Sequence, residues 1–165
     1  MRDTPFKVLF LCTANSARSI LAEAILRREG GARFEAYSAG SQPRGEVHPF
    51  ALDLLAREGH DISKLRSKSW DEFADGDGES DLDFIFTVCD AAGAEVCPVW
   101  PGQPLSTHWG IPDPAALGEN EAEQRLAFVQ AYRTLSDRIK AMIALPDLSI
   151  DKQSLKRHFQ DIATL

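Results

Sequence analysis

Residues 6–19 read Phe6-Lys7-Val8-Leu9-Phe10-Leu11-Cys12-Thr13-Ala14-Asn15-Ser16-Ala17-Arg18-Ser19, an apolar run that passes directly into a short polar loop. The run is interrupted only by Lys7, which is typical of a strand buried on both faces of a parallel sheet. After the loop, apolar residues recur at helical spacing over 19–29, and Gly30-Gly31 ends the pattern. The segment therefore predicts a strand, a loop and a helix in direct succession.

Strands and helices are predicted to alternate along the rest of the chain. Further strands are expected at 34–39, 82–88 and 96–100, the last short and interrupted by Pro98, and further helices at 49–58, 67–73, 121–145 and 154–162. Such alternation predicts an α/β fold, a three-layer sandwich in which helices flank both faces of a four-stranded parallel sheet. No internal repeat or long linker divides residues 1–165, so a single domain is expected.

Composition excludes several classes of function. The net charge of -7 and the lack of a basic stripe argue against nucleic acid as a partner. No apolar run has the length needed to cross a bilayer, and no signal peptide fits the first residues. We therefore expect a cytoplasmic protein that does not associate with membranes. The four histidines show no zinc-ligand spacing, so we expect no metal site built from them. A monomer is expected.

Cys12 and Arg18 stand six positions apart on the turn that leaves the first strand. A helix N-terminus and a nearby arginine both lower the pKa of a cysteine and so favour the nucleophilic thiolate. The guanidinium of Arg18 can give two parallel hydrogen bonds to an oxyanion. Backbone N–H groups of a curved loop form an anion nest, here from Thr13, Ala14, Asn15, Ser16, Ala17 and Arg18. The loop therefore predicts covalent attack on a tetrahedral oxyanion such as phosphate or arsenate.

Two neighbouring residues are expected to support this loop. Ser19, at the start of the helix, can donate a hydrogen bond to the sulfur of Cys12, and Asn15 tolerates a left-handed backbone in mid-loop. The alternative is that Cys12 is a small buried apolar residue at a strand end. Arg18, Ser19 and the strand-loop-helix context favour the nucleophile.

A second cysteine is expected near the first. Cys12 follows the first predicted strand and Cys89 follows the third. Ligands of parallel sheets bind at the carboxyl ends of the strands, so the two cysteines can lie in one crevice. With Cys97 the chain has three cysteines, which cannot all form disulfide pairs. This count indicates redox or nucleophilic use of the cysteines more than a structural disulfide framework.

Together these residues resemble the low-molecular-weight protein tyrosine phosphatase superfamily, which includes thioredoxin-coupled arsenate reductases. Its Cys-x-x-x-x-x-Arg-Ser signature is matched by Cys12, Asn15, Arg18 and Ser19, and the resemblance extends through Ser38-Ala39-Gly40, Val88-Cys89 and Asp113-Pro114. Ala14 departs from the usual glycine, and Ala17 from the second loop cysteine of many phosphatases. The resemblance implies a phosphatase-type P-loop after the first strand.

The resemblance also implies a general acid. In both branches of the superfamily, an aspartate before proline protonates the leaving oxygen, and Asp113 stands at that place. The string His108-Trp109-Gly110-Ile111-Pro112-Asp113-Pro114 is similar to the arsenate reductase version. Phosphatases tend to carry tyrosines just after this aspartate, where this chain has Ala115-Ala116-Leu117. By itself, an Asp-Pro pair favours a simple turn.

Cys89 and Cys97 bear on whether the protein reduces arsenate or hydrolyses a phosphate ester. The segment 89–98 resembles the reductase segment in which Cys89 and Cys97 form the redox pair, which implies a relay from Cys12 through Cys89 to Cys97 and then to a thioredoxin-like reductant. The alternatives are a phosphotyrosine phosphatase that acts through a Cys12 phosphoenzyme, with inert extra cysteines, and a non-catalytic oxyanion-binding module. The sequence does not identify the reductant.

A cation site is implied by the same resemblance. Some arsenate reductases of this group hold a potassium ion with an asparagine, a glutamate, a serine and an aspartate, and Asn15, Glu23, Ser38 and Asp71 stand at matching places. The alternative is that these residues are ordinary polar groups of helices and turns. No other bound cofactor is expected.

Overall fold

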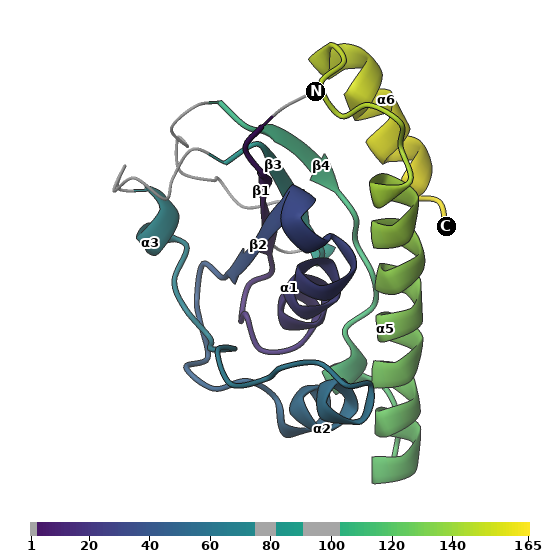
Figure 1. Ribbon diagram of the computed structural model, residues 1–165. Coiled ribbons are helices and arrows are strands. Elements are labelled where there is room, and N and C mark those ends of the chain that lie inside the picture. Colours follow the sequence, from purple (N-terminus) through teal and green to yellow (C-terminus); the bar gives the residue numbers. More distant parts are fainter. Residues whose placement is uncertain (1–2, 75–81, 91–102) are drawn as a thin grey trace.

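The structure is a computed structural model that describes residues 3–74, 82–90 and 103–165 (Figure 1). Cys97 and the strand predicted at 96–100 lie outside the described residues.

Four parallel strands form the sheet, in the order β2-β1-β3-β4. They are β1 (Phe6–Leu11), β2 (Phe34–Ala39), β3 (Phe84–Thr87) and β4 (Leu105–His108). The strand at the centre, β1, pairs with both β2 and β3, and its last residue, Leu11, lies opposite Ala39 on one side and Thr87 on the other. The prediction of a four-stranded parallel sheet is confirmed, and the loop that follows β1 lies between two neighbouring strand ends.

The helices begin and end close to the predicted positions, with one exception. They are α1 (Arg18–Glu29), α2 (Pro49–Arg57), α3 (Asp71–Ala74), α5 (Glu121–Ile143) and α6 (Lys152–Ile162), with short 3-10 turns η1 (Gly31–Arg33) and η2 (Pro114–Ala116). Local caps fix several of these starts. The side chain of Asn120 accepts a hydrogen bond from Glu123 N at α5, and that of Asp151 accepts one from Ser154 N at α6.

Alternate residues of β1 enter two separate apolar cores. Val8 and Phe10 pack into a large core with α1, α2, α5 and α6, whereas Leu9 and Leu11 pack on the other face with Phe73 of α3. Figure 1 shows the same division, with α1 and α5 on one side of the sheet and α3 on the other. The prediction that helices flank both faces is therefore confirmed.

The last helix, α6, is part of the main core. Phe159 of α6 is fully buried and packs edge-on against the rings of Phe84 and Phe86, 5.1 Å from each. The indole nitrogen of Trp109 donates a hydrogen bond to Phe159 O at 2.9 Å. The helix thus covers β3 and β4 on the face that also packs against α1.

The structure adds one strand that was not predicted and corrects one predicted helix. The fourth strand is Leu105–His108, which the sequence analysis did not predict. The helix predicted at 67–73 is confined to Asp71–Ala74, because Gly40 forms a parallel bridge with Ser69 and holds the backbone of 68–70 against the end of β2. None of the helices among the described residues is long and apolar enough to cross a membrane.

Candidate active site

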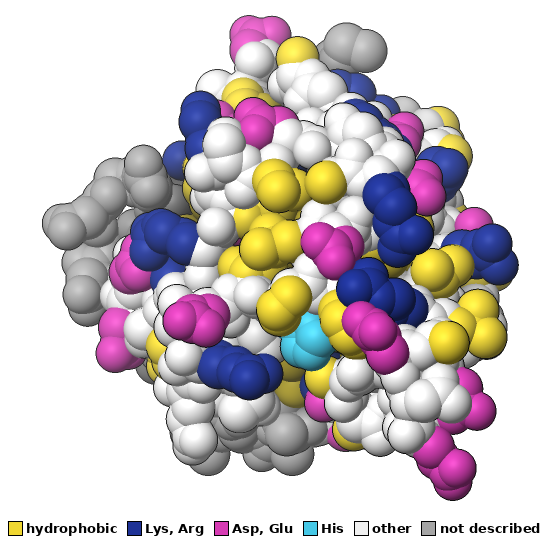
Figure 2. All heavy atoms as spheres, turned by 90° about the horizontal axis from the view of Figure 1, so that it is seen from below, with side chains coloured by type: hydrophobic (Ala, Val, Ile, Leu, Met, Phe, Trp, Pro, Cys, Tyr) yellow, Lys and Arg dark blue, Asp and Glu magenta, His cyan; other side chains and the backbone are white. Residues whose placement is uncertain are grey.

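The loop between β1 and α1, residues 12–17, lies where the strands end. Figure 2 views the molecule from this side and shows apolar side chains with basic and acidic ones among them. In the loop, Cys12 is 4 % exposed, and Asn15 is fully buried. Cys12, the predicted nucleophile, is therefore buried inside a closely packed loop.

The carbonyl groups of the loop point outward to neighbouring chain segments. Thr13 O accepts from Gln42 N at 3.0 Å, Ala14 O from Arg44 N at 2.9 Å, and Ser16 O from His48 N at 2.8 Å. Because the carbonyls turn toward these donors, the amide groups of the curved loop are left to face its interior. This arrangement suits the anion nest predicted from the sequence.

Asn15 and Gly40 set the curvature of the loop. Asn15 has a φ of 46°, the left-handed conformation expected for it. Its side chain donates to Ser19 Oγ at 2.8 Å and accepts from Lys68 N at 2.8 Å. Gly40 approaches so closely that a Cβ atom there would lie 2.4 Å from Thr13 O and 2.7 Å from Cys12 O. Ser19 Oγ thus accepts a hydrogen bond from Asn15, and the expected donation from its hydroxyl to the sulfur of Cys12 stays a prediction.

Cys89 lies beside the loop, as the sequence predicted. Thr13 N donates a hydrogen bond to Cys89 Sγ at 3.3 Å, and Cys89 lies close enough to Cys12 to raise the pKa of the Cys12 thiol. Both cysteines are buried. Two thiols from strands that are far apart in the sequence therefore meet at one oxyanion loop.

The ionisation of Cys12 differs from the sequence expectation. The hydrogen bond with Cys89, and then burial, raise the pKa of Cys12, whereas the charge of Arg18 and a hydrogen bond from the backbone of Ala14 lower it. The predicted lowering counted the helix N-terminus and the arginine but not a second thiol in contact. In this arrangement the Cys12 thiol is favoured over the thiolate.

Arg18 bridges the oxyanion loop and the segment that carries Asp113. Its Nη1 donates to Ile111 O at 2.9 Å, and its Nη2 lies 3.8 Å from Asp113 Oδ2. Asp113 caps η2, because its Oδ1 accepts from Ala115 N at 3.0 Å. The structure therefore places the carboxyl group of Asp113 beside Arg18 at the end of the oxyanion loop, and its role as an acid stays a prediction.

A histidine that sequence reasoning gave no role lies next to Cys89. His108 Nδ1 is 2.6 Å from Thr87 Oγ1, and His108 Nε2 is 2.9 Å from Asp90 Oδ1. A Cβ atom on Gly110 would lie 2.5 Å from His108 Nε2, so a larger residue there would displace the His108 side chain. These residues connect the strand ends of β3 and β4 around the second cysteine, a link that no local pattern in the sequence indicates.

The predicted potassium ligands are only partly brought together. Glu23 and Ser38 are buried and hydrogen-bonded to each other, but Asp71 is exposed at the start of α3. The ammonium group of Lys68 lies with Glu23 and Ser38 instead, so the donor set as predicted does not fit a potassium ion. Among the described residues, no cluster of three or more His, Cys, Asp or Glu side chains could hold a metal.

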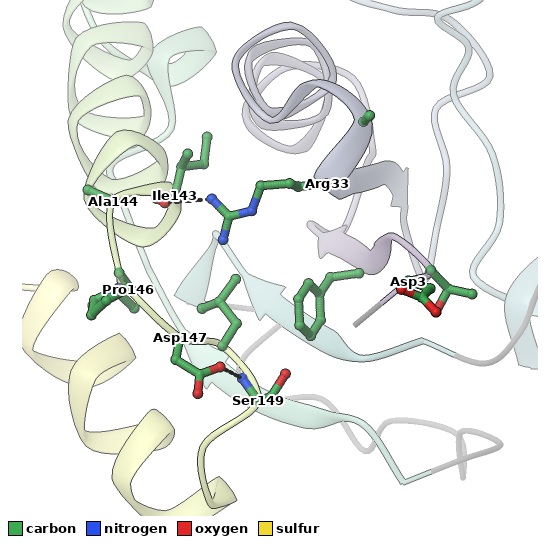
Figure 3. Close-up of a pocket in the computed structure, with 12 residues that line it drawn as sticks. Asp3, Arg33, Ile143, Ala144, Pro146, Asp147 and Ser149 are labelled. Atoms are coloured by element: carbon green, nitrogen blue, oxygen red, sulfur yellow. Dashed lines mark hydrogen bonds between the residues drawn. The ribbon is translucent and has the colours of Figure 1, made fainter. Parts of the chain in front are cut away.

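A separate pocket of about 530 Å³ lies at the opposite end of the sheet (Figure 3). It is lined by Phe6, at the start of β1, and by residues between α5 and α6. Arg33 donates to Ile143 O at 3.0 Å across it, and Asp147 accepts from Ser149 N at 2.8 Å. The pocket is not part of the cysteine site, because Cys12 follows the other end of the same strand.

Comparison with known proteins places the chain in one family. Residues 7–160 match the family model of low molecular weight phosphotyrosine protein phosphatases. Arsenate reductase from Bacillus licheniformis is 36 % identical over 134 residues, which are 81 % of this chain and 91 % of that protein. The protein belongs to the low-molecular-weight phosphotyrosine phosphatase family.

Solved structures agree with this assignment. An arsenate reductase in the phosphate binding state has a TM-score of 0.69 at 27 % identity, over 84 % of this chain and 97 % of that one. The thioredoxin-dependent arsenate reductase of Corynebacterium glutamicum has a TM-score of 0.65 at 27 % identity, over 89 % of this chain and 66 % of that one. Within the family, the chain is thus similar to the arsenate reductases.

Proposed function

We propose that the protein reduces arsenate to arsenite with a relay of three cysteines and is then re-reduced by a thioredoxin-like protein. The observation that carries the proposal is the position of Cys89, whose sulfur accepts a hydrogen bond from the oxyanion loop at Thr13 N and contacts Cys12. Hydrolysis of a phosphoenzyme needs only water at this place, whereas reduction needs a second thiol.

The first step is the capture of arsenate. The thiolate of Cys12 attacks arsenic(V), and an arsenate oxygen leaves as water after Asp113 gives it a proton. Arg18 and the loop amides balance the negative charge of the anion. The Cys12 thiol must lose its proton for this attack, and the basic oxyanion that it meets is a suitable acceptor.

The second step transfers the electrons. The thiolate of Cys89 attacks the sulfur of Cys12, the sulfur–arsenic bond breaks, and its electron pair goes to arsenic, which leaves as arsenite. A Cys12–Cys89 disulfide results. Cys97 then attacks Cys89 and releases Cys12 as a thiolate, and a dithiol partner reduces the Cys89–Cys97 disulfide and becomes a disulfide itself.

Replacement of Cys89 by serine tests this scheme. With arsenate, thioredoxin and thioredoxin reductase, Cys89→Ser should show no turnover above background, while its hydrolysis of an aryl phosphate should persist, because capture by Cys12 is intact. Cys12→Ser should lose both activities. Arsenate turnover by Cys89→Ser at the wild-type rate would show that the chain does not use this relay.

Peptide mapping gives an independent test of the order of events. After one turnover without reductant, the wild-type protein should contain a Cys89–Cys97 disulfide, and Cys97→Ser should stop at Cys12–Cys89. A wild-type protein that consumes one equivalent of arsenate and keeps all three thiols would contradict the proposal.

A further inference from the structure

Lys68 is a buried lysine with an enclosed ammonium group. The residue is 8 % exposed, and its Nζ lies 3.3 Å from Ser38 Oγ, 3.5 Å from Glu23 Oε1 and 3.1 Å from Arg66 O. Lysine is almost never so deeply buried unless it is paired. Here the three oxygen atoms surround a single positive charge, as the ligands of a small cation do.

Glu23 favours a positive charge at this place, in addition to that of Arg27. Its carboxylate is 2 % exposed, and such a group is costly to bury without a positive partner. Arg27 contacts Oε2, while Oε1 accepts from Ser38 and faces the ammonium of Lys68. Burial lowers the pKa of Lys68, and the charge of Glu23 opposes that lowering, so the carboxylate of Glu23 favours the charged ammonium group.

The backbone of Lys68 connects this ion pair to the oxyanion loop. Lys68 N donates to Asn15 Oδ1 at 2.8 Å, and Lys68 O accepts from Gly40 N at 2.9 Å. The adjacent Ser67 Oγ donates to Ala14 O at 3.1 Å. The residue that holds the positive charge therefore also holds Asn15, which carries the left-handed turn of the loop.

We propose that Lys68 is a built-in monovalent cation, which neutralises Glu23 and positions Asn15 of the oxyanion loop in place of a bound potassium ion. An ammonium group and a potassium ion carry the same charge and are of similar size. The protein is accordingly independent of potassium. The proposal rests on the loop being the anion site, but not on whether arsenate is the anion.

The first test is a comparison of salts with the wild-type protein. Its melting temperature, and its affinity for inorganic phosphate measured by calorimetry, should be the same in potassium, sodium and choline chloride at equal ionic strength. A higher melting temperature or tighter phosphate binding in potassium alone would overturn the proposal. Neither readout needs arsenate turnover, so failure here is distinct from failure of the relay.

The second test removes the ammonium group of Lys68 and asks whether an added cation can replace it. In choline chloride, Lys68→Ala should melt about 6–20 °C below the wild type, as expected when one partner of a buried ion pair is removed. It should also bind phosphate more weakly, and potassium or ammonium chloride should restore much of both losses. Lys64→Ala, which removes an exposed lysine nearby, is the matched control and should respond to none of these salts. Full stability of Lys68→Ala in choline, or losses that no small cation reverses, would contradict the proposal.

If Lys68→Ala does not fold, a double variant can test whether Lys68 positions the oxyanion loop. Glu23→Gln with Lys68→Met removes both charges and keeps the side-chain volumes. If Lys68 positions the loop, this variant should fold but bind phosphate more weakly in every salt. Wild-type phosphate affinity in the double variant would show that Lys68 only neutralises Glu23, and would overturn the positioning role.

Discussion

The contact between Cys12 and Cys89 links the reactivity of one sulfur to the presence of the other. A thiol that donates a hydrogen bond to a second sulfur loses that bond when it ionises, and burial adds to the cost. Arg18 acts in the opposite direction. The nucleophile is therefore restrained in the resting protein by the same residue that is proposed to complete the reaction.

Removal of Cys89 should make Cys12 more acidic. In Cys89→Ala, the contact that contributes most to the raised pKa of Cys12 is absent, while Arg18 remains. The midpoint of the pH profile for alkylation of Cys12 by iodoacetamide should shift to lower pH, and mass spectrometry can assign the label. A midpoint equal to or above that of the wild type would contradict this prediction.

At the scale of secondary structure, the end of β2 is held against the oxyanion loop by one glycine. A Cβ atom on Gly40 would meet two backbone oxygens, Thr13 O and Cys12 O, which cannot move as a flexible side chain can. The same residue bonds to Lys68 through its N–H group and to Trp70 through its carbonyl. The loop, β2 and the segment before α3 are therefore packed together at this point.

Gly40→Ala should damage both stability and binding. Overpacking of this kind costs about 1–3 kcal/mol, and here the displaced atoms belong to the anion loop. We expect a lower free energy of unfolding in urea and weaker binding of phosphate. Ser41→Ala, one position further along, is the control and should change neither by a comparable amount. Wild-type phosphate affinity in Gly40→Ala would show that the loop tolerates the methyl group.

The helices and strands that were predicted with correct bounds are those whose sequence patterns lie within the element itself. β1 and β2 have the predicted bounds, and α5 begins at Glu121 as predicted, directly after its capping residue, Asn120. β4 was missed because only Thr107 of its four residues is buried, so it shows no apolar run. Its identity as a strand depends on pairing with β3, which a local pattern does not reveal.

The residues of the site also divide into those that a local sequence motif predicts and those that it does not. Cys12, Arg18 and Asn15 lie in one short motif, so their arrangement followed from spacing, and Cys89 followed from its place after a strand. Lys68 could not be predicted, because its partners Glu23 and Ser38 come from other elements and only the fold brings them together. The raised pKa of Cys12 was missed for a related reason, since it depends on a contact between residues far apart in sequence.

At the scale of the whole molecule, α6 is part of the main core. Phe159 is fully buried among the rings of Phe84, Phe86 and Trp109, and Arg138 of α5 donates to Trp109 O at 2.8 Å. Trp109 in turn precedes the segment that carries Asp113. The last helix therefore supports the side of the site on which the proposed acid lies.

Phe159→Ala should destabilise the whole protein. Truncation of a buried phenylalanine typically costs about 3–5 kcal/mol, which corresponds to a fall in melting temperature of roughly 6–20 °C for a chain of this size. Calorimetry can measure this fall. The control is Gln160→Ala, which changes an exposed neighbour on the same helix and should leave the melting temperature nearly unchanged. An equal effect of both substitutions would mean that α6 docks without its aromatic anchor.

The neighbouring positions of β1 and β3 have a consequence for the proposed catalytic cycle. A bond between Cys12 and Cys89 would tie together two points of the chain that are distant in sequence, and a covalent loop of that length removes roughly 4 kcal/mol of conformational freedom from the unfolded chain. The Cys12–Cys89 intermediate would then resist unfolding more than the reduced protein does. Attack by Cys97 would open that long covalent loop, so the added stability would last for only one step of each turnover.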